Sequence, residues 1–566
     1  MILSAMIIIP LAGGLVAWLA GRRQADAARW TALAANAVNL VLVAALLARS
    51  PGAAGNGPWV AEESARWLPS LGIGYHLAAD GLSLILLALT AFIGLIAVLV
   101  SWREIQERVG LFHAALLWTL AGITGVFLAL DLFLFYFFWE VMLVPMYFLI
   151  GVWGHERRIY AAVKFFIFTL AGGLLMLVAI VALAVIHGRQ TGTLTFDYVP
   201  LLETALTPGT QMWLFLGFFA AFAVKLPAVP IHNWLPDAHT EAPTAGSVIL
   251  AALLLKTGAY GLLRFAVPLF PEAARLFAPA AMVLGVVGII YGAILAFAQT
   301  DLKRLVAYTS VSHMGFVLLG IFAWNELALQ GTILQMICHG ISTGALFIIV
   351  GMLSERLHTR DVASMGGLWT IWPRMGGLAM VFVMASLGLP GLGNFVGEFL
   401  ILFGVYKASI ALAVLAAVGV VFATIYSLAI MQRVFHGERA ADVPGGDLNA
   451  REVFILGVLV VAIVWLGLYP RPALDVSRPV LEEMRPAVGE WMTPHPAARL
   501  SGVTVPDVSS IQDRRAALAE DGEVAAIGTG EVAVFSAAGS PATEVGKVAV
   551  IGGCDIASIG NREEAL

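Results

Sequence analysis

Fourteen apolar runs of about twenty residues divide most of the chain, and they restrict the folds that it can adopt. A helix of that length spans the hydrocarbon core of a bilayer. The sequence is 60% hydrophobic and 12% charged, and that charge fraction is about half of the usual value for a soluble domain. We therefore predict an all-α polytopic membrane protein with about 14 transmembrane helices. The predicted spans lie near residues 2–20, 30–48, 80–102, 112–130, 131–151, 160–186, 211–226, 243–266, 276–299, 303–323, 328–353, 375–400, 409–431 and 453–470.

Basic residues are distributed unevenly over the loops between these runs. The odd-numbered loops contain most of them, including Arg22, Arg157, Lys303 and Arg360, whereas the even-numbered loops contain few, such as Arg189. By the positive-inside rule, the odd-numbered loops are cytoplasmic and both termini lie on the outer, periplasmic side. The N-terminal run has no basic segment before it, so we interpret it as a first span rather than a signal peptide.

Composition and motifs exclude several classes of site. The two cysteines, Cys338 and Cys554, are too few to ligate an iron–sulfur cluster or a structural zinc ion. We find no haem, flavin or nucleotide motif, and no basic patch that would bind nucleic acid. The chain is therefore expected to hold no cofactor and no metal.

Two of the apolar runs are interrupted by proline and glycine. Lys225 lies at the end of an apolar run, and Pro227 and Pro230 follow it directly. Proline removes a backbone donor and clashes with the preceding turn, so we expect a broken helix here. A second interruption, Gly388-Leu-Pro-Gly-Leu-Gly, places Pro390 at the matching position of a later five-helix unit. Matching interruptions in two inverted units are typical of the ion path of a transporter.

These breaks define the predicted organisation of the chain. Two inverted five-helix repeats follow three N-terminal spans, and each repeat contains one broken helix. The last part of the chain is Ala-, Gly- and Val-rich and contains no span, so we expect a loosely ordered extension there. The predicted parts are 1–111 for the N-terminal spans, 112–266 and 267–435 for the repeats, 436–499 for the last span and a polar exit, and 500–566 for the extension.

Two of the intramembrane charges are expected to act as a pair. Lys225 ends one apolar run, and Glu140 lies within another. A charge at membrane depth costs at least roughly 2.5–3.5 kcal/mol, so it normally faces a partner or water. We predict that Glu140 pairs with Lys225, because separating such a pair changes the proton affinity of both groups. The alternative is a structural glutamate, buried in its neutral form against a hydroxyl group.

Four further titratable residues lie in separate predicted spans: Lys256, His313, His339 and Glu398. Histidine titrates near neutral pH, and together with nearby hydroxyl groups these side chains are suited to carrying protons along a file of water. Each histidine alone is equally compatible with a satisfied core residue. Metal binding is a weaker alternative, because the short ligand spacing of a zinc site is missing.

Two other charged residues are lesser candidates, and a third is expected at the membrane interface. Lys164 lies within the sixth span, and Asp131 precedes the fifth, where it is equally suited to capping that helix. Arg264 lies near the outer end of the eighth span, and we expect its side chain to extend to the membrane interface.

At these positions the sequence resembles the antiporter-like membrane subunits of respiratory complex I, the bacterial NADH-quinone oxidoreductase, and among them those of the subunit M type. The resemblance covers residues 1 to about 490. M-type subunits have a glutamate in the broken twelfth helix where related subunits have lysine, and Glu398 occupies that position. Five stretches carry the resemblance: Phe138-Trp-Glu-Val-Met-Leu-Val-Pro, Lys225-Leu-Pro, His232-Asn-Trp-Leu-Pro-Asp-Ala-His-Thr-Glu-Ala-Pro, Asp301-Leu-Lys-Arg-Leu-Val-Ala-Tyr and Gly391-Leu-Gly-Asn-Phe-Val-Gly-Glu-Phe.

The resemblance implies a proton-translocating subunit of a NADH:quinone oxidoreductase in the bacterial inner membrane. Glu140 and Lys225 would form the switching ion pair, Lys256 with the two histidines would carry protons, and Glu398 would release them outward. The redox centres, FMN and iron–sulfur clusters, and the quinone site would belong to partner subunits. The expected partners are other membrane-arm subunits, especially the related subunits L and N.

Two other functions stay open at this point. An Mrp-type or stand-alone cation/proton antiporter would use the same carboxylate and lysines. A purely structural subunit of a membrane complex would tolerate the loss of Glu140.

Overall fold

The computed structural model describes residues 1–49, 59–438 and 446–488. Within them the chain is helical apart from one small antiparallel hairpin. Cys554 and the predicted extension 500–566 lie outside the described residues. Twelve helices of the described part are long and apolar enough to cross a membrane, and the remaining two predicted spans are the interrupted ones.

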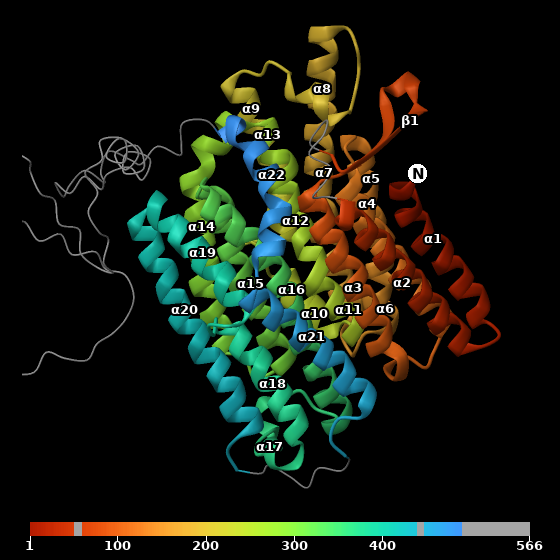
Figure 1. Ribbon diagram of the computed structural model, residues 1–566, viewed down its shortest axis with the longest axis vertical. Helices are drawn as coiled ribbons and strands as arrows, with labels where there is room; N and C mark the ends of the chain where they lie inside the picture. The colour runs from red at the N-terminus through yellow and green to blue at the C-terminus, as the bar shows by residue number, and fades with distance from the viewer. Residues whose placement is uncertain (50–58, 439–445, 489–566) are drawn as a thin grey trace, which may run out of the picture. The chain divides into compact units, whose positions relative to one another are not determined.

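The N-terminal part contains three spans and the hairpin. They are α1 (Ile2–Gly21), α2 (Ala25–Arg49) and α3 (Gly81–Glu104). The hairpin is formed by strands β1 (Ala61–Leu68) and β2 (Ile73–Ala79), which were not predicted from the sequence. The hairpin lies near α8 at the upper end of Figure 1, and α17 lies at the other end. We call these two ends of the bundle the hairpin end and the α17 end.

The first five-span unit follows α3. Its fourth span is interrupted between α9 and α10, and its second has a short interruption at Met142, next to Glu140. The short helix α8 (Tyr198–Leu202) precedes α9. The spans are α4 (Val109–Leu128), α5 (Leu132–Val141) with α6 (Leu143–Trp153), α7 (Arg158–Thr191), α9 (Pro208–Lys225) with α10 (Trp234–Glu241), and Thr244–Leu269.

The last span of this unit changes its helical period twice. Between α11 (Thr244–Ile249), α12 (Leu255–Gly261) and α13 (Val267–Leu269) lie two π-helical turns, Leu250–Leu254 and Leu262–Ala266. Single π-helical turns within α-helices occur frequently at functional sites. Lys256 lies directly after the first of these turns.

The second unit repeats this order, with its fourth span again interrupted. Because five spans separate matching helices, the second unit enters the membrane from the opposite side. The short helix α17 (Leu368–Ile371) precedes the broken span. The spans are α14 (Pro271–Phe297), α15 (Leu302–Phe322), α16 (Glu326–Leu357), α18 (Pro373–Ser386) with α19 (Gly393–Ala408), and α20 (Ile410–Ile430), which ends in the π-helical turn Met431–Phe435.

Both predicted helix breaks are confirmed. Helix α9 ends at Lys225, before Pro227, and the indole Nε1 of Trp234 donates to Val224 O at 2.9 Å, which satisfies a carbonyl that the break leaves without an amide. The second break contains Gly388 and Gly391, with φ of +80° and +94°. Residues with a side chain rarely adopt such backbone angles, so glycine is favoured at both positions.

The spans differ in how far the rest of the chain covers them. In the most apolar 18 residues of each span, every residue is buried in the Thr244–Leu269 span and in α15, and 94% of the residues are buried in α16. The corresponding share is 33% in α1 and 39% in the span that contains α20. The three covered spans carry Lys256, His313 and His339. These titratable groups are therefore shielded from lipid, as intramembrane charges usually are.

The final described segment contains a helix that was not predicted. The last span, α21 (Ala450–Leu468), is followed by a helix, α22 (Arg471–Val488), in the segment that was expected only to be a polar exit. Helix α22 packs against α3 and α16. Gly81 allows this approach, because a Cβ atom there would collide with the carbonyl group of Val476.

Candidate functional site

Four of the predicted residues form one row across the middle of the bundle. Lys256 Nζ lies 2.7 Å from His339 Nδ1, and the His339 and His313 rings are 5.6 Å apart between centroids. His313 Nδ1 lies 2.8 Å from Glu398 Oε1. All four side chains are at least 95% buried. We call Lys256, His339, His313 and Glu398 the buried row.

The local structure of each helix positions this row. Lys256 Nζ also donates to Ala251 O at 2.6 Å, and Ala251 lies in the π-helical turn before it. A π-helical turn shifts carbonyl groups out of the usual register, so the turn supplies an acceptor for the lysine inside the membrane. Glu398 lies in the first turns of α19, directly after the second helix break.

Three neutral side chains that were not identified from the sequence surround the Glu398 end of the row. Gln335 Nε2 donates to Glu398 Oε1 at 2.7 Å. Ser386 Oγ and the Tyr426 hydroxyl both lie 3.1 Å from His313 Nε2. These contacts join helices α16, α18 and α20, and no local sequence pattern indicates them. They hold His313 between a carboxylate and two hydroxyl groups, which is an arrangement suited to proton transfer.

Glu140 and Lys225 are not connected in this way. Lys225 Nζ is buried, as is Glu140 Oε1, and neither atom has a hydrogen-bond partner among the described residues. Their charges nevertheless act on each other. The predicted pair is therefore an electrostatic one without direct contact in this structure.

Aromatic rings and a glycine surround this pair. Lys225 Nζ lies 5.4 Å from the ring centroids of both Trp139 and Phe165, and such cation–π contacts offset part of the cost of burying an ammonium group. Gly173 of α7 adjoins Glu140: a Cβ atom there would lie 2.5 Å from Glu140 Oε1. The position of the carboxyl group therefore depends on the absence of a side chain at residue 173.

His239 of the broken helix is a further buried histidine, and it was not selected from the sequence. It is fully buried in α10, stacks on Phe347 at 4.4 Å between ring centroids, and neither ring nitrogen has a hydrogen-bond partner among the described residues. The charges of Lys256 and Lys303 both act on it. The sequence feature that could have indicated His239 is its position seven residues after His232, in the stretch that follows the first break.

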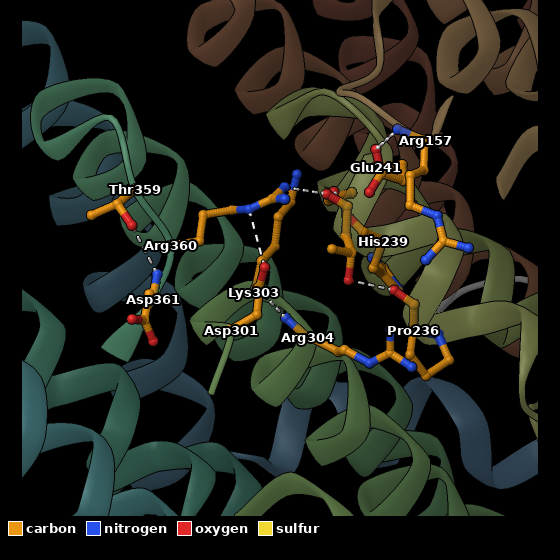
Figure 2. Close-up of polar contacts among 12 residues, drawn as sticks. Arg157, Pro236, His239, Glu241, Asp301, Lys303, Arg304, Thr359, Arg360 and Asp361 are labelled. Carbon is orange, nitrogen blue, oxygen red and sulfur yellow. Dashed lines mark hydrogen bonds and ion pairs between the residues drawn. The ribbon is translucent and has the colours of Figure 1, made fainter. Parts of the chain in front are cut away.

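Helix α10 is fixed at its α17 end by cations from the second unit (Figure 2). Lys303 Nζ donates to Ala242 O, and Arg360 Nη1 donates to Thr240 O. Cations at the end of a helix interact favourably with its free carbonyls and its dipole. Arg360 Nε also forms an ion pair with Asp301 Oδ2 at 3.2 Å.

Asp237 of the same helix joins the two units. Lys164 Nζ of α7 lies 2.6 Å from Asp237 Oδ2, and Arg304 Nη1 of α15 lies 3.1 Å from Asp237 Oδ1. The lesser candidate Lys164 is thus a bridging residue in this structure. The second lesser candidate, Asp131, caps α5 by accepting from the Phe133 and Leu134 amides, so the capping interpretation is confirmed.

The prediction for Arg264 was wrong. Its side chain is 6% exposed and forms an ion pair with Asp80, the residue that caps α3. The guanidinium also lies over the rings of Trp59 and Tyr260. A buried carboxylate on a neighbouring element gives the cation a partner inside the bundle, so the side chain does not extend to the membrane interface.

Comparisons with known proteins give one consistent result. Residues 129–424 match the family model described as NADH:quinone oxidoreductase/Mrp antiporter, TM. The chain is 55% identical over 492 residues to NADH-quinone oxidoreductase subunit M of Pseudomonas aeruginosa, and the match covers 84% of this chain and 96% of the relative.

Two solved structures have a similar fold. A chain of respiratory complex I from Thermus thermophilus with bound NADH matches with a TM-score of 0.77 and 31% identity, covering 86% of this chain and all of that one. A chain of the Mrp complex from Dietzia sp. matches with a TM-score of 0.75 at 21% identity, covering 85% and 96% of the two chains, which is a likeness of fold alone.

Proposed function

This chain belongs to the NADH:quinone oxidoreductase/Mrp antiporter family of membrane subunits, in its subunit M branch, and from this premise we propose how it works. It translocates protons in the membrane arm of a bacterial NADH:quinone oxidoreductase. The buried row carries this proposal, because it joins three helices that are almost entirely covered and a broken one through titratable side chains in close contact. Titratable residues inside a membrane bundle mark functional sites, and chains of acidic residues and histidines form the proton relays of pumps and transporters.

Each charged residue has a distinct role in this proposal. Lys256 takes up a proton, His339 and His313 pass it along the row, and Glu398 releases it toward the hairpin end. Glu140 and Lys225 act as a gate: when Glu140 approaches Lys225 it stabilises the ammonium form, and when it withdraws the lysine loses its proton more readily. Ser386 and Tyr426 supply hydroxyl groups that orient His313.

The orientation of the chain in the membrane and its partner subunits are part of the same proposal. The α17 end carries the loops rich in arginine and lysine, so it faces the cytoplasm, and the N-terminus lies at the periplasmic side of the inner membrane. NADH oxidation takes place in partner subunits that hold FMN and iron–sulfur clusters, and the quinone also binds outside this chain. Neighbouring antiporter-like subunits of types L and N contact it within the membrane arm.

Purification from native membranes tests this function. We expect a tagged chain to co-purify with flavin- and iron–sulfur-containing subunits, and the purified complex in liposomes to acidify the lumen when NADH and quinone are added. The alternative, an Mrp-type or stand-alone antiporter, predicts Na⁺/H⁺ exchange by the chain without redox subunits. Exchange of that kind, without co-purifying redox subunits, would contradict the proposal.

A further inference from the structure

A cavity of about 350 Å³ lies at the α17 end, between α3, α11, α15, α16 and α21. Its lining includes three carboxylates, Glu104, Glu355 and Glu452, and three cations, Lys303, Arg360 and Arg451. These formal charges cancel, so the lining favours neither an anion nor a metal cation. A polar cavity of this size holds several water molecules, since one water occupies about 30 Å³ of the liquid.

Each of the three cations donates a hydrogen bond to a backbone carbonyl. Lys303 donates to Ala242 O directly after α10, Arg360 donates to Thr240 O in the last turn of α10, and Arg451 Nη1 donates to Leu99 O at 3.1 Å. They are therefore fixed parts of the wall. Glu452 is also engaged, because it accepts from Arg356 Nη2 at 2.7 Å and completes the cap of α21.

Glu104 is different, because its two oxygens have different surroundings. Oε1 accepts from Thr244 N at 2.8 Å and from Thr244 Oγ1 at 2.9 Å, and so it caps α11 from a neighbouring helix. Oε2 is buried and has no hydrogen-bond partner among the described residues. One oxygen thus anchors the span that carries Lys256, while the other is available for a proton.

The neighbouring His155 is a poorer acceptor. It lies in the loop between α6 and α7, where burial, and then the charges of Lys303 and Arg360, lower its pKa to about 4. At neutral pH it therefore stays neutral and binds protons weakly. The remaining histidine of the lining, His358, is exposed.

We propose that this cavity is a water-filled proton-loading vestibule and that Glu104 is the carboxylate that receives protons from it. A hydronium ion transfers a proton to Glu104 Oε2, which forms an O–H bond and leaves water. The carboxylic acid then releases the proton inward, toward Lys256 of the buried row, and returns to the carboxylate. This proposal rests on the proposed function, since it supplies the buried row with protons.

Substitution of Glu104 in the assembled complex tests the vestibule. Glu104→Gln keeps an oxygen that can accept from both Thr244 donors, so the complex should assemble, but an amide cannot carry a proton. We expect proton pumping to slow by roughly tenfold or more, and Glu104→Asp to retain part of the rate. The control is Glu107→Gln, which removes an exposed carboxylate three residues away and should leave pumping unchanged.

The outcomes separate this inference from the proposed function. If Glu104→Gln pumps like wild type while Lys256→Ala does not, Glu104 is only a helix cap, and the vestibule proposal is overturned while the proposed function stands. If the Lys256→Ala complex assembles and also pumps normally, the proposed function fails. Slow pumping by Glu104→Gln, with full assembly and a normal Glu107→Gln complex, supports the vestibule.

Discussion

The two groups of candidate residues differ in how they are connected. The buried row is joined by contacts of 2.7 and 2.8 Å with two histidine rings between them, whereas Lys225 and Glu140 have buried atoms without hydrogen bonds among the described residues. A proton can move along the first group with only small side-chain rotations. The second group has to move, or to admit water, before a proton can cross it, and it is therefore suited to be the gate.

The largest effect is expected from removing the charge of the gate. Glu140→Gln keeps the size of the side chain but leaves Lys225 without its partner charge, so we expect pumping to fall by roughly two orders of magnitude or more. Glu140→Asp should retain some activity, because the charge remains with a shorter reach. Reconstituted complex in liposomes measures both rates, and wild-type pumping by an assembled Glu140→Gln complex would remove the gate from the mechanism.

Glu398 tests the far end of the buried row. Glu398→Gln can still accept from Gln335, but it cannot release a proton, so we expect pumping to slow by roughly tenfold to a hundredfold. Glu398→Lys should retain more activity than Glu398→Ala, because a buried lysine can still exchange a proton. Glu272→Gln, at an exposed carboxylate of α14, serves as the control. Near-normal pumping by Glu398→Gln would leave Glu398 with a structural role only.

A smaller effect is expected where the shape of the gate is changed and its charges are kept. Gly173→Ala places a methyl group 2.5 Å from the present position of Glu140 Oε1, and the flexible carboxyl group must move. We expect a barrier increase of about 1 kcal/mol, or roughly a fivefold loss of rate. Gly188→Ala in the same helix has ordinary contacts and should have no effect. Equal, undiminished rates for both variants would show that the position of Glu140 is not critical.

The smallest effect concerns a histidine outside the membrane-spanning segments. His76 of β2 lies between Asp197 and Glu62, and the hydrogen bond with Asp197 is the main cause that raises its pKa above 6.5. Its stabilising effect is complete below pH 6.5 and is lost as the pH rises through the raised pKa. We expect amide hydrogen exchange in residues 61–79 to become faster at alkaline pH, after correction for the intrinsic pH dependence of exchange. The free energy of opening of the hairpin should fall by less than about 1 kcal/mol. His76→Gln should abolish that dependence, and a similar pH dependence in this variant would assign it to another group.

The sequence predicted the spans better than their connections. Apolar length located every span, and Pro227 and Pro390 located both breaks, because these signals are local. The hairpin was missed although its strands are adjacent in the chain, because the mostly exposed strand β1 has no clear apolar alternation. Helix α22 and the burial of Arg264 were missed, because they depend on partners that lie far away in the chain, such as Asp80 for Arg264. The contacts of His313 with Ser386 and Tyr426 have the same origin, since helix packing alone brings them together.

Proton transfer through Lys256 is the central claim, and the Lys256→Arg complex tests it most directly. Arginine keeps the positive charge and can donate to Ala251 O and His339, but it does not release its proton. We expect the assembled complex to lose proton pumping, while Lys164→Arg, at the bridging lysine, pumps normally. Pumping at the wild-type rate by Lys256→Arg would show that Lys256 acts only through its charge, and would contradict the relay.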